Sequence, residues 1–158
     1  MEEKSVKNDI LEQPIGFLTK VMNMKFVHYL SELCAKRYGL EHRQMGILSI
    51  CHKAPTTQTE LSSYGDLDKN YARIYVDDLE AKGLITRVIN PKNRREKLVT
   101  LTKKGEKLAK EGREMMKEAQ NAILSPYLSD DEIRTLHEIL LKFFIKMKEN
   151  QIQTKEKR

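Results

Sequence analysis

The sequence predicts a mainly α-helical protein that carries one small β-hairpin, and three observations support this fold class. The chain has no tryptophan and only 7 glycines and 4 prolines in 158 residues, so residues that break helices are scarce. Apolar residues recur at three- and four-residue spacing along several long segments. One region departs from that spacing: VINPKNRREKLVTLT, residues 88–102, places β-branched runs on both sides of a proline and a cluster of positive charge.

The size and charge of the chain limit what it can be. A length of 158 residues suits one domain with a real core, so we predict a single domain spanning residues 1–158. A net charge of +6 favours an anionic partner, nucleic acid first and an acidic membrane surface second. No apolar run approaches the roughly 20 residues of a membrane span, and the start of the chain is polar where a secretory signal would be apolar. Two cysteines are too few for a disulfide framework, so a cytoplasmic protein is expected.

The first predicted helix covers residues 15–38. Pro14 precedes it, where a proline can begin a helix, and Gly39 follows it as a C-cap. A second helix is expected from residue 41 to about residue 53, because Pro55 cannot continue it. The first helix has a wide apolar face, formed by Phe17, Leu18, Val21, Met22, Met24, Phe26, Val27, Leu30 and Leu33.

Residues 56–85 predict two further helices joined by a tight turn. Thr57 and Glu60 form a capping box, which begins a short helix at Gln58 that ends by Gly65. Asp68 then caps a longer helix that Gly83 ends. The apolar positions of that longer helix are Ala72, Tyr75, Val76 and Leu79. Two helices in this arrangement form a helix-turn-helix.

The hairpin follows directly. Ile85–Ile89 and Leu98–Leu101 each suit a strand, and the asparagines and proline of residues 90–93 turn the chain. Its only acid is Glu96, whereas its tip and flanks carry five cations: Arg87, Lys92, Arg94, Arg95 and Lys97.

Two long helices complete the chain. Thr102 caps the first of them, and Ser129 with Glu132 forms a second capping box ahead of a final helix that runs to about Glu149. The remaining residues, QIQTKEKR, are polar and are predicted to be loose. The apolar face of the final helix is formed by Ile133, Leu136, Ile139, Leu140, Phe143, Phe144 and Met147.

From residue 15 to about residue 147, the order of elements and the residues resemble the MarR family of bacterial and archaeal transcriptional regulators. The most specific match is in the hairpin, where Asn93, Arg94 and Arg95 precede a strand that ends in Leu101 and Thr102. The stretches LEAKGLITR before it and LTKKG after it are also similar. The chain departs from the family pattern twice. Asn93 replaces the usual aspartate, which leaves the wing without its usual anchoring carboxylate, and Arg73–Ile74 replaces a Thr-Arg pair, so the base-reading pattern is expected to differ.

The resemblance implies a winged helix-turn-helix dimer. It places the DNA-binding lobe at about residues 41–101 and the dimerisation helices at about residues 9–37 and 103–149. It also implies that a small anionic or phenolic effector releases the protein from DNA. The expected function is therefore a homodimeric repressor of a pseudo-palindromic operator, relieved by a small-molecule ligand, with no cofactor.

The residue types agree with DNA binding. The helix that follows Asp68 is long enough to enter the major groove, where Asn70 suits adenine and Arg73 suits guanine. Asp77, Asp78 and Glu80, near the C-terminus of this helix, would repel phosphates, so that end is expected to point away from DNA. In the hairpin, Arg94 or Arg95 at the tip is expected to enter the minor groove, while the lysines meet phosphates. The complete set of predicted DNA-binding residues is Lys69, Asn70, Tyr71, Arg73, Ser62, Ser63, Arg87, Lys92, Arg94, Arg95 and Lys97.

Each of these interpretations has a plainer alternative. A cluster of charge on a hairpin is often only a solvated turn, and Ser62 and Ser63 suit an exposed helix surface equally well. Two recognition helices roughly 34 Å apart require a dimer. The predicted dimerisation residues, some of which could instead fill the core of one subunit, are Phe17, Leu140, Phe143 and Phe144.

Other function classes have weaker support. Cys34 and Cys51 could sense oxidants, but buried, inert cysteines are favoured. No two of the four histidines share the spacing of a metal pair, so a metal site is not predicted, although a redox- or metal-responsive regulator of the same fold remains an alternative. No catalytic motif is present, so an enzyme is not expected. A winged-helix protein-interaction module would have a neutral wing, whereas this wing is strongly basic. A membrane-binding protein would carry its basic residues on an amphipathic helix, whereas here they concentrate on a hairpin.

Overall fold

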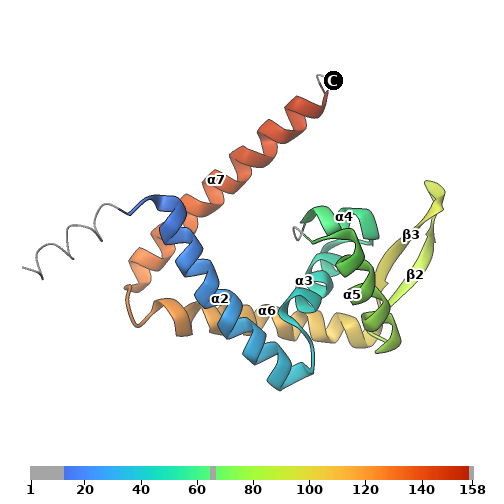
Figure 1. Cartoon of the computed structure of the whole chain (residues 1–158), viewed down its shortest axis with the longest axis horizontal. Helices are drawn as coiled ribbons and strands as arrows, with labels where there is room; N and C mark the ends of the chain where they lie inside the picture. The colour runs from blue at the N-terminus through green and yellow to red at the C-terminus, as the bar shows by residue number, and fades with distance from the viewer. Residues whose placement is uncertain (1–12, 65–66, 157–158) are drawn as a thin grey trace, which may run out of the picture. The chain divides into compact units, whose positions relative to one another are not determined.

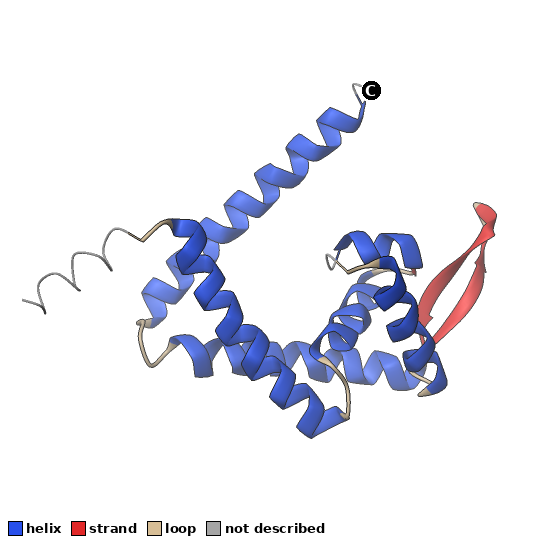
Figure 2. Cartoon of the chain, in the orientation of Figure 1, coloured by secondary structure: helices blue, strands red, loops and turns tan. Residues whose placement is uncertain are grey.

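The computed structural model describes residues 13–64 and 67–156, and the chain divides into two compact units, residues 1–119 and residues 120–158. Most of the described residues are helical, and the strands form one small sheet (Figure 2). The predicted fold class, mainly α with a β-hairpin wing, is confirmed. No described helix is both long enough and apolar enough to cross a membrane.

Four helices come first in the described part of the first unit, and Figure 1 labels them. They are α2 (Ile15–Tyr38), α3 (His42–Lys53), α4 (Gln58–Tyr64) and α5 (Lys69–Ala81). All four lie where the sequence predicts them. The predicted first dimerisation segment starts at residue 9, and its residues 9–12 lie outside the described part of the chain.

The caps that delimit these helices are formed as predicted. In the capping box, the Thr57 backbone N–H donates to Glu60 Oε2 at 2.8 Å, and the Glu60 N–H donates to Thr57 Oγ1 at 3.2 Å. Asp68 Oδ1 accepts the Asn70 N–H at 2.8 Å, which begins α5. Gly39 has a φ of 62°, in the left-handed region that a helix C-cap requires. Gly65, the predicted end of α4, lies outside the described residues.

The hairpin is present, but its second strand is longer than predicted. The sheet contains β1 (Thr56–Thr57), β2 (Ile85–Asn90) and β3 (Asn93–Leu101), in the antiparallel order β1-β3-β2. The prediction began the second strand at Leu98, because only there do apolar residues return. Residues 93–97 of β3 are exposed, so this part of the strand is held by its pairing with β2 and not by burial of apolar side chains. The two-residue β1 was not predicted, since it is too short to show a pattern.

The pairing register explains where the wing cations lie. Ile85 pairs with Leu101 and the register continues regularly to Ile89 opposite Lys97, after which it shifts so that Asn90 pairs with Asn93. Arg94, Arg95 and Glu96 lie within this irregularity, and Pro91 and Lys92 form the turn itself. The prediction that Arg94 or Arg95 forms the tip is therefore wrong in detail: both arginines are strand residues next to the tip.

The core of the first unit lies between α3, α4, α5 and the sheet, with the N-terminal part of α6 (Lys103–Leu124) packed against it. Thr102 Oγ1 accepts the Gly105 N–H at 3.1 Å, which confirms Thr102 as the cap of α6. The largest fully buried side chains are Ile47, Leu48, Leu61, Leu79, Ile85, Met115, Val76, Val99 and Cys34. This core fixes α5 and the hairpin relative to each other.

The second unit contains the end of α6 and α7 (Asp130–Glu156). The predicted capping box is formed, with the Ser129 N–H donating to Glu132 Oε2 at 2.8 Å. The prediction that the chain loosens after about Glu149 is wrong, because α7 continues to Glu156. No glycine or proline follows Pro126. Most of the polar residues in this stretch are Glu, Gln and Lys, which are good helix formers. Among the side chains of α7 that the structure describes, the exposed large apolar ones are Ile139, Leu140, Leu141, Phe143, Phe144 and Ile145.

Candidate nucleic-acid interface

The N-terminal half of α5 presents the predicted base-reading residues to solvent. Lys69, Asn70 and Arg73 are all exposed, and Asn70 and Arg73, three positions apart, lie on the same side of the helix. No ion pair engages Arg73 within the described part of the chain. Tyr71 is also exposed, and its ring centroid lies 6.3 Å from that of Tyr75. The opposite face of α5 is buried, so this half of the helix can meet a groove through these residues and the exposed Ile74.

The wing carries four cations that the structure leaves exposed: Lys92, Arg94, Arg95 and Lys97. No acid of residues 13–64 or 67–156 forms an ion pair with any of them. Two asparagines shape the turn between them. Asn90 Oδ1 accepts the Lys92 N–H at 3.0 Å, and Asn93 Oδ1 accepts the Arg95 N–H at 3.2 Å. Asn93 thus stabilises the turn through its amide oxygen in place of a carboxylate.

Arg87 has a different role from the other wing cations. Its guanidinium forms ion pairs with Asp77 and Glu80, both late in α5, and its side chain is only 18% exposed. Its backbone N–H also donates to Glu80 Oε1 at 3.1 Å. Arg87 therefore anchors the wing to α5 and is not available as a DNA contact. No local pattern in the sequence indicates this pairing, because Arg87 is seven positions from Glu80 and ten from Asp77.

The two serines of α4 differ in accessibility. Ser62 is buried, and its hydroxyl donates to the Gln58 carbonyl at 3.1 Å, so it has no access to a phosphate. Ser63 is exposed, and its hydroxyl donates to the Thr59 carbonyl at 3.3 Å. Burial rules out the predicted phosphate contact for Ser62, whereas the contact of Ser63 stays a prediction.

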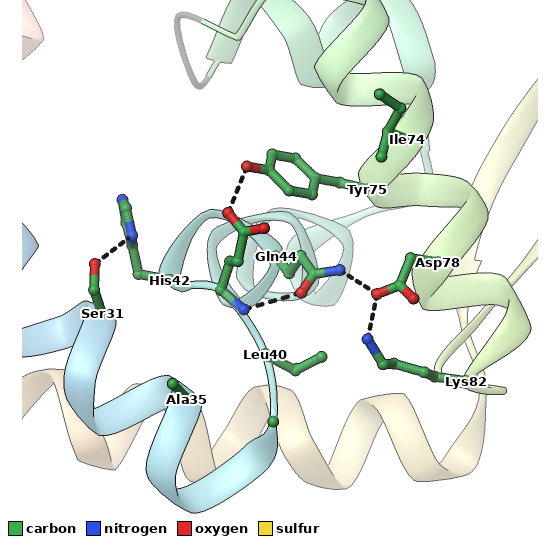
Figure 3. Close-up of a pocket in the computed structure, with 11 residues that line it drawn as sticks. Ser31, Ala35, Leu40, His42, Gln44, Ile74, Tyr75, Asp78 and Lys82 are labelled. Carbon is green, nitrogen blue, oxygen red and sulfur yellow. Dashed lines mark hydrogen bonds and ion pairs between the residues drawn. The ribbon is translucent and has the colours of Figure 1, made fainter.

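Side chains at the N-terminus of α3 contact α5 along a pocket of about 770 Å³ (Figure 3). The Tyr75 hydroxyl donates to Glu41 Oε2 at 2.6 Å, and Gln44 Nε2 donates to Asp78 Oδ2 at 2.6 Å. Lys82 also binds Asp78, and the hydrogen bonds from Lys82 and then from Gln44 lower the pKa of that carboxyl. Sequence reasoning missed this cluster, which joins residues 34 positions apart.

The same pocket connects α3 to α2. Ser31 Oγ lies 2.9 Å from His42 Nδ1 and donates its hydrogen to the Val27 carbonyl at 2.6 Å. Because a hydroxyl has one hydrogen, His42 Nδ1 is the donor to Ser31. Burial, and next the charge of Arg43, lower the pKa of His42, so the ring favours its neutral form.

A second cavity, of about 400 Å³, lies among α2, α3 and α6 of the first unit. Its apolar lining includes Leu30, Cys34, Met45 and Met115, whereas Arg43 contributes a charged group. Both cysteines are buried, as the sequence predicts. Burial raises the pKa of the Cys34 thiol, and it raises the pKa of Cys51 to about 11.

We expect both thiols of the native protein to react slowly with a thiol reagent at pH 8. With a pKa of about 11, Cys51 is a thiolate in roughly one molecule in a thousand at that pH, and burial also blocks access. Release of chromophore from a disulfide reagent should be slow in buffer and rapid in guanidinium chloride. Rapid, stoichiometric reaction of the native protein would contradict this inertness and would favour an oxidant-sensing role.

The comparisons with known proteins agree with this geometry. A winged helix-turn-helix family model matches residues 44–120. The HTH-type transcriptional regulator BilQ of Clostridium symbiosum is 28% identical over 136 residues, which cover 84% of this chain and 91% of that protein. Within the described part of the chain, no group of three or more acidic, histidine or cysteine side chains could hold a metal ion.

Solved structures show the same fold over most of the chain. Wild-type MarR from E. coli, in its apo form, is 26% identical with a TM-score of 0.74, and the match covers 83% of this chain and 97% of that one. A MarR family protein of Mycobacterium tuberculosis, solved with p-aminosalicylic acid, is 20% identical with a TM-score of 0.72 and coverage of 83% and 98%. The exposed face of α5 and the basic wing agree with these matches: the chain is a winged helix-turn-helix protein whose homologue is a transcriptional regulator and whose structural neighbours are MarR family proteins.

Proposed function

We propose that this transcriptional regulator is a homodimeric repressor that reads a pseudo-palindromic operator and is released from it by a small anionic or phenolic ligand. In this proposal the two units of the chain act together as one MarR-type domain. One observation carries the proposal: α5 exposes an asparagine and an arginine on one side, and a wing with four exposed cations follows in the same unit.

The division of labour between helix and wing follows from the chemistry of the exposed groups. Asn70 and Arg73 can each make two hydrogen bonds to one base edge in the major groove, adenine and guanine respectively. Lys69 and Ser63 suit phosphates beside that groove, and Tyr71 offers both a hydroxyl and an apolar ring. On the wing, Arg94 or Arg95 would enter the minor groove, with Lys92 and Lys97 on the flanking phosphates.

Two helices support a dimer. α2 exposes Phe17, at 51% of its surface, within a longer apolar face, and α7 exposes Leu140, Phe143 and Phe144 among its apolar residues. Apolar surface of this extent is costly in water, and a second copy of the chain would cover it. A two-fold dimer would present two copies of α5 to successive major grooves, which is why the operator is expected to be an inverted repeat.

The cavity among α2, α3 and α6 supports the proposal of a small anionic or phenolic ligand. Its size and apolar lining suit a small aromatic molecule, and Arg43 could pair with a carboxylate or phenolate on that molecule. The related protein solved with p-aminosalicylic acid shares the fold, and its ligand is of this chemical class. Such a ligand releases DNA only if it binds one arrangement of the recognition helices better than the other.

The proposal is tested by selecting bound duplexes from a random-sequence library and then titrating the selected and a scrambled duplex across a salt series. We expect an inverted repeat, bound well above the scrambled control, with one dimer per site. Weak binding that is equal for both duplexes and vanishes with salt would overturn sequence reading and would leave only generic charge attraction. A screen of aromatic acids against the selected complex then tests the ligand.

Replacing Arg95 with alanine should weaken operator binding by about 1.5 kcal/mol or more, the value of a hydrogen bond to a charged group. The reason is that a guanidinium is attracted to the narrow, strongly negative minor groove of A·T-rich sequence, so the preference for A·T-rich flanks should also flatten. Binding to operators with A·T-rich and G·C-rich flanks measures both effects. Arg94→Ala, which removes the same charge one residue away, is measured beside it and shows which of the two arginines enters the minor groove. If Arg95→Ala leaves operator affinity unchanged, the minor-groove assignment of Arg95 is wrong.

A further inference from the structure

The first turn of α3 joins α2 to the recognition helix. Three hydrogen bonds meet there: His42 with Ser31 of α2, Glu41 with Tyr75 of α5, and Gln44 with Asp78 of α5. All of them lie within the first unit and along the pocket that Figure 3 shows. None of these side chains is among the predicted DNA contacts, so the cluster has no role yet in the proposed function.

Gln44 is the central member of the cluster. Only 4% of its surface is exposed, and both ends of its amide are engaged: Oε1 accepts the Glu41 N–H at 2.9 Å, and Nε2 donates to Asp78. A buried amide that lost either partner would carry an unsatisfied polar group, which is costly. The position of Asp78 is therefore tied through one rigid side chain to the backbone at the start of α3.

Two attachments fix the orientation of α5 better than one. Tyr75 and Asp78 are three residues apart, so they lie on the same side of the helix and about 4.5 Å apart along its axis. A single contact would allow the helix to pivot around it. With both contacts made, rotation and tilt of α5 relative to α3 are restrained, and with them the positions of Asn70 and Arg73.

Reading base edges and binding phosphates differ in how much they depend on this restraint. Bidentate hydrogen bonds to a base need placement to within roughly 0.5 Å. Attraction to phosphates is long-ranged and tolerates small rotations, because it depends mainly on net charge and salt. A change in the orientation of α5 should therefore reduce specific binding far more than non-specific binding.

We infer that Gln44 is a positioning residue for DNA reading, which holds α5 through Asp78 in the orientation that lets Asn70 and Arg73 reach base edges. This inference rests on the proposed function, since it requires α5 to read sequence. It adds that specificity depends on a side chain that does not itself touch DNA.

The test uses the full-length protein, the selected operator and a scrambled duplex. Gln44→Glu places a carboxylate against that of Asp78 and should lower operator affinity tenfold or more while changing affinity for the scrambled duplex less than threefold. Gln44→Glu combined with Asp78→Asn restores a hydrogen bond with its polarity reversed and leaves the net charge as in the wild type. This double variant should recover operator affinity to within about threefold of the wild type. Gln120→Glu in α6 is the control for the added charge.

A second variant covers the case in which Gln44→Glu does not fold. Gln44→Met keeps the volume and adds no charge but cannot hold Asp78, so it should also lower the ratio of operator to scrambled affinity. Thermal melting of each variant separates a loss of stability from a loss of orientation, because lost stability in a still-folded protein would not change that ratio.

The possible failures are distinguishable. If the wild type does not discriminate between the two duplexes, the proposed function fails and this inference fails with it. If the wild type discriminates and the folded Gln44 variants keep the same ratio, or lose affinity equally for both duplexes, only the positioning role is overturned. Failure of the double variant to recover affinity would overturn the hydrogen bond to Asp78 as its basis.

Discussion

Gly105→Ala should lower the free energy of unfolding by about 3 kcal/mol, the upper end of what overpacking a core costs. A Cβ at this position would lie 1.9 Å from the Leu84 carbonyl oxygen, a backbone atom. That oxygen cannot easily move away, because it accepts the Thr102 N–H at 3.1 Å and lies 3.2 Å from the Thr102 hydroxyl. Either the start of α6 must shift or these bonds must lengthen. Chemical denaturation monitored by circular dichroism measures the loss.

Gly46→Ala is the matched control for this prediction. Gly46 also lies inside a helix, but nothing is within 4 Å of a Cβ built there. Alanine should therefore stabilise the protein by about 0.5–1 kcal/mol, since glycine loses more backbone freedom on folding. If Gly105→Ala were as stable as the wild type, the close approach of α6 to the start of β2 would be incorrect.

Arg73→Ala should cost about 1–3 kcal/mol of operator affinity, concentrated at a single base pair. The arginine is exposed, no ion pair within residues 13–64 or 67–156 engages it, and it lies beside Asn70 on the face of α5 opposite the core. A bidentate contact to guanine discriminates at one position only. Affinities for a panel of operators, each with one base pair exchanged, should show that the variant has lost its preference at that position and kept it elsewhere.

Lys92→Ala supplies the comparison. Lys92 lies in the wing turn, and we expect it to meet a phosphate, so its loss should weaken binding to every duplex about equally and reduce the salt slope by about one. If Arg73→Ala behaved in the same way as Lys92→Ala, then Arg73 would be a phosphate contact, and base reading would have to come from Asn70 or another residue of α5.

Local chemistry explains why the helices could be predicted from the sequence. The capping boxes at Thr57 and Ser129 and the cap at Asp68 act over three residues, so their patterns are visible in the sequence, and the structure forms all three. The predicted end of α7 near Glu149 is wrong because it rests on the polarity of the residues that follow. Polarity does not end a helix, whereas glycine and proline do, and neither is present there.

Features that depend on long-range contacts could not be predicted. The role of Arg87 depends on acids brought near it by the packing of β2 against α5, and its charge alone suggested a DNA contact. In the same way, the bond of Gln44 to the Glu41 N–H is local to the start of α3, whereas its bond to Asp78 depends on the packing of α3 against α5. Ser62 lies on the buried side of a seven-residue helix, too short for its pattern to show which side that is.

The asparagines that shape the wing turn have an electrostatic consequence. Asn90 and Asn93 accept the Lys92 and Arg95 backbone N–H groups through neutral amide oxygens. An aspartate at position 93 could accept the same bond, but it would place a negative charge beside the cations that approach DNA. The amide leaves the local potential of the turn more positive. This wing should therefore release more counterions on binding than one with an aspartate in the turn, and its affinity for DNA should fall more steeply with salt.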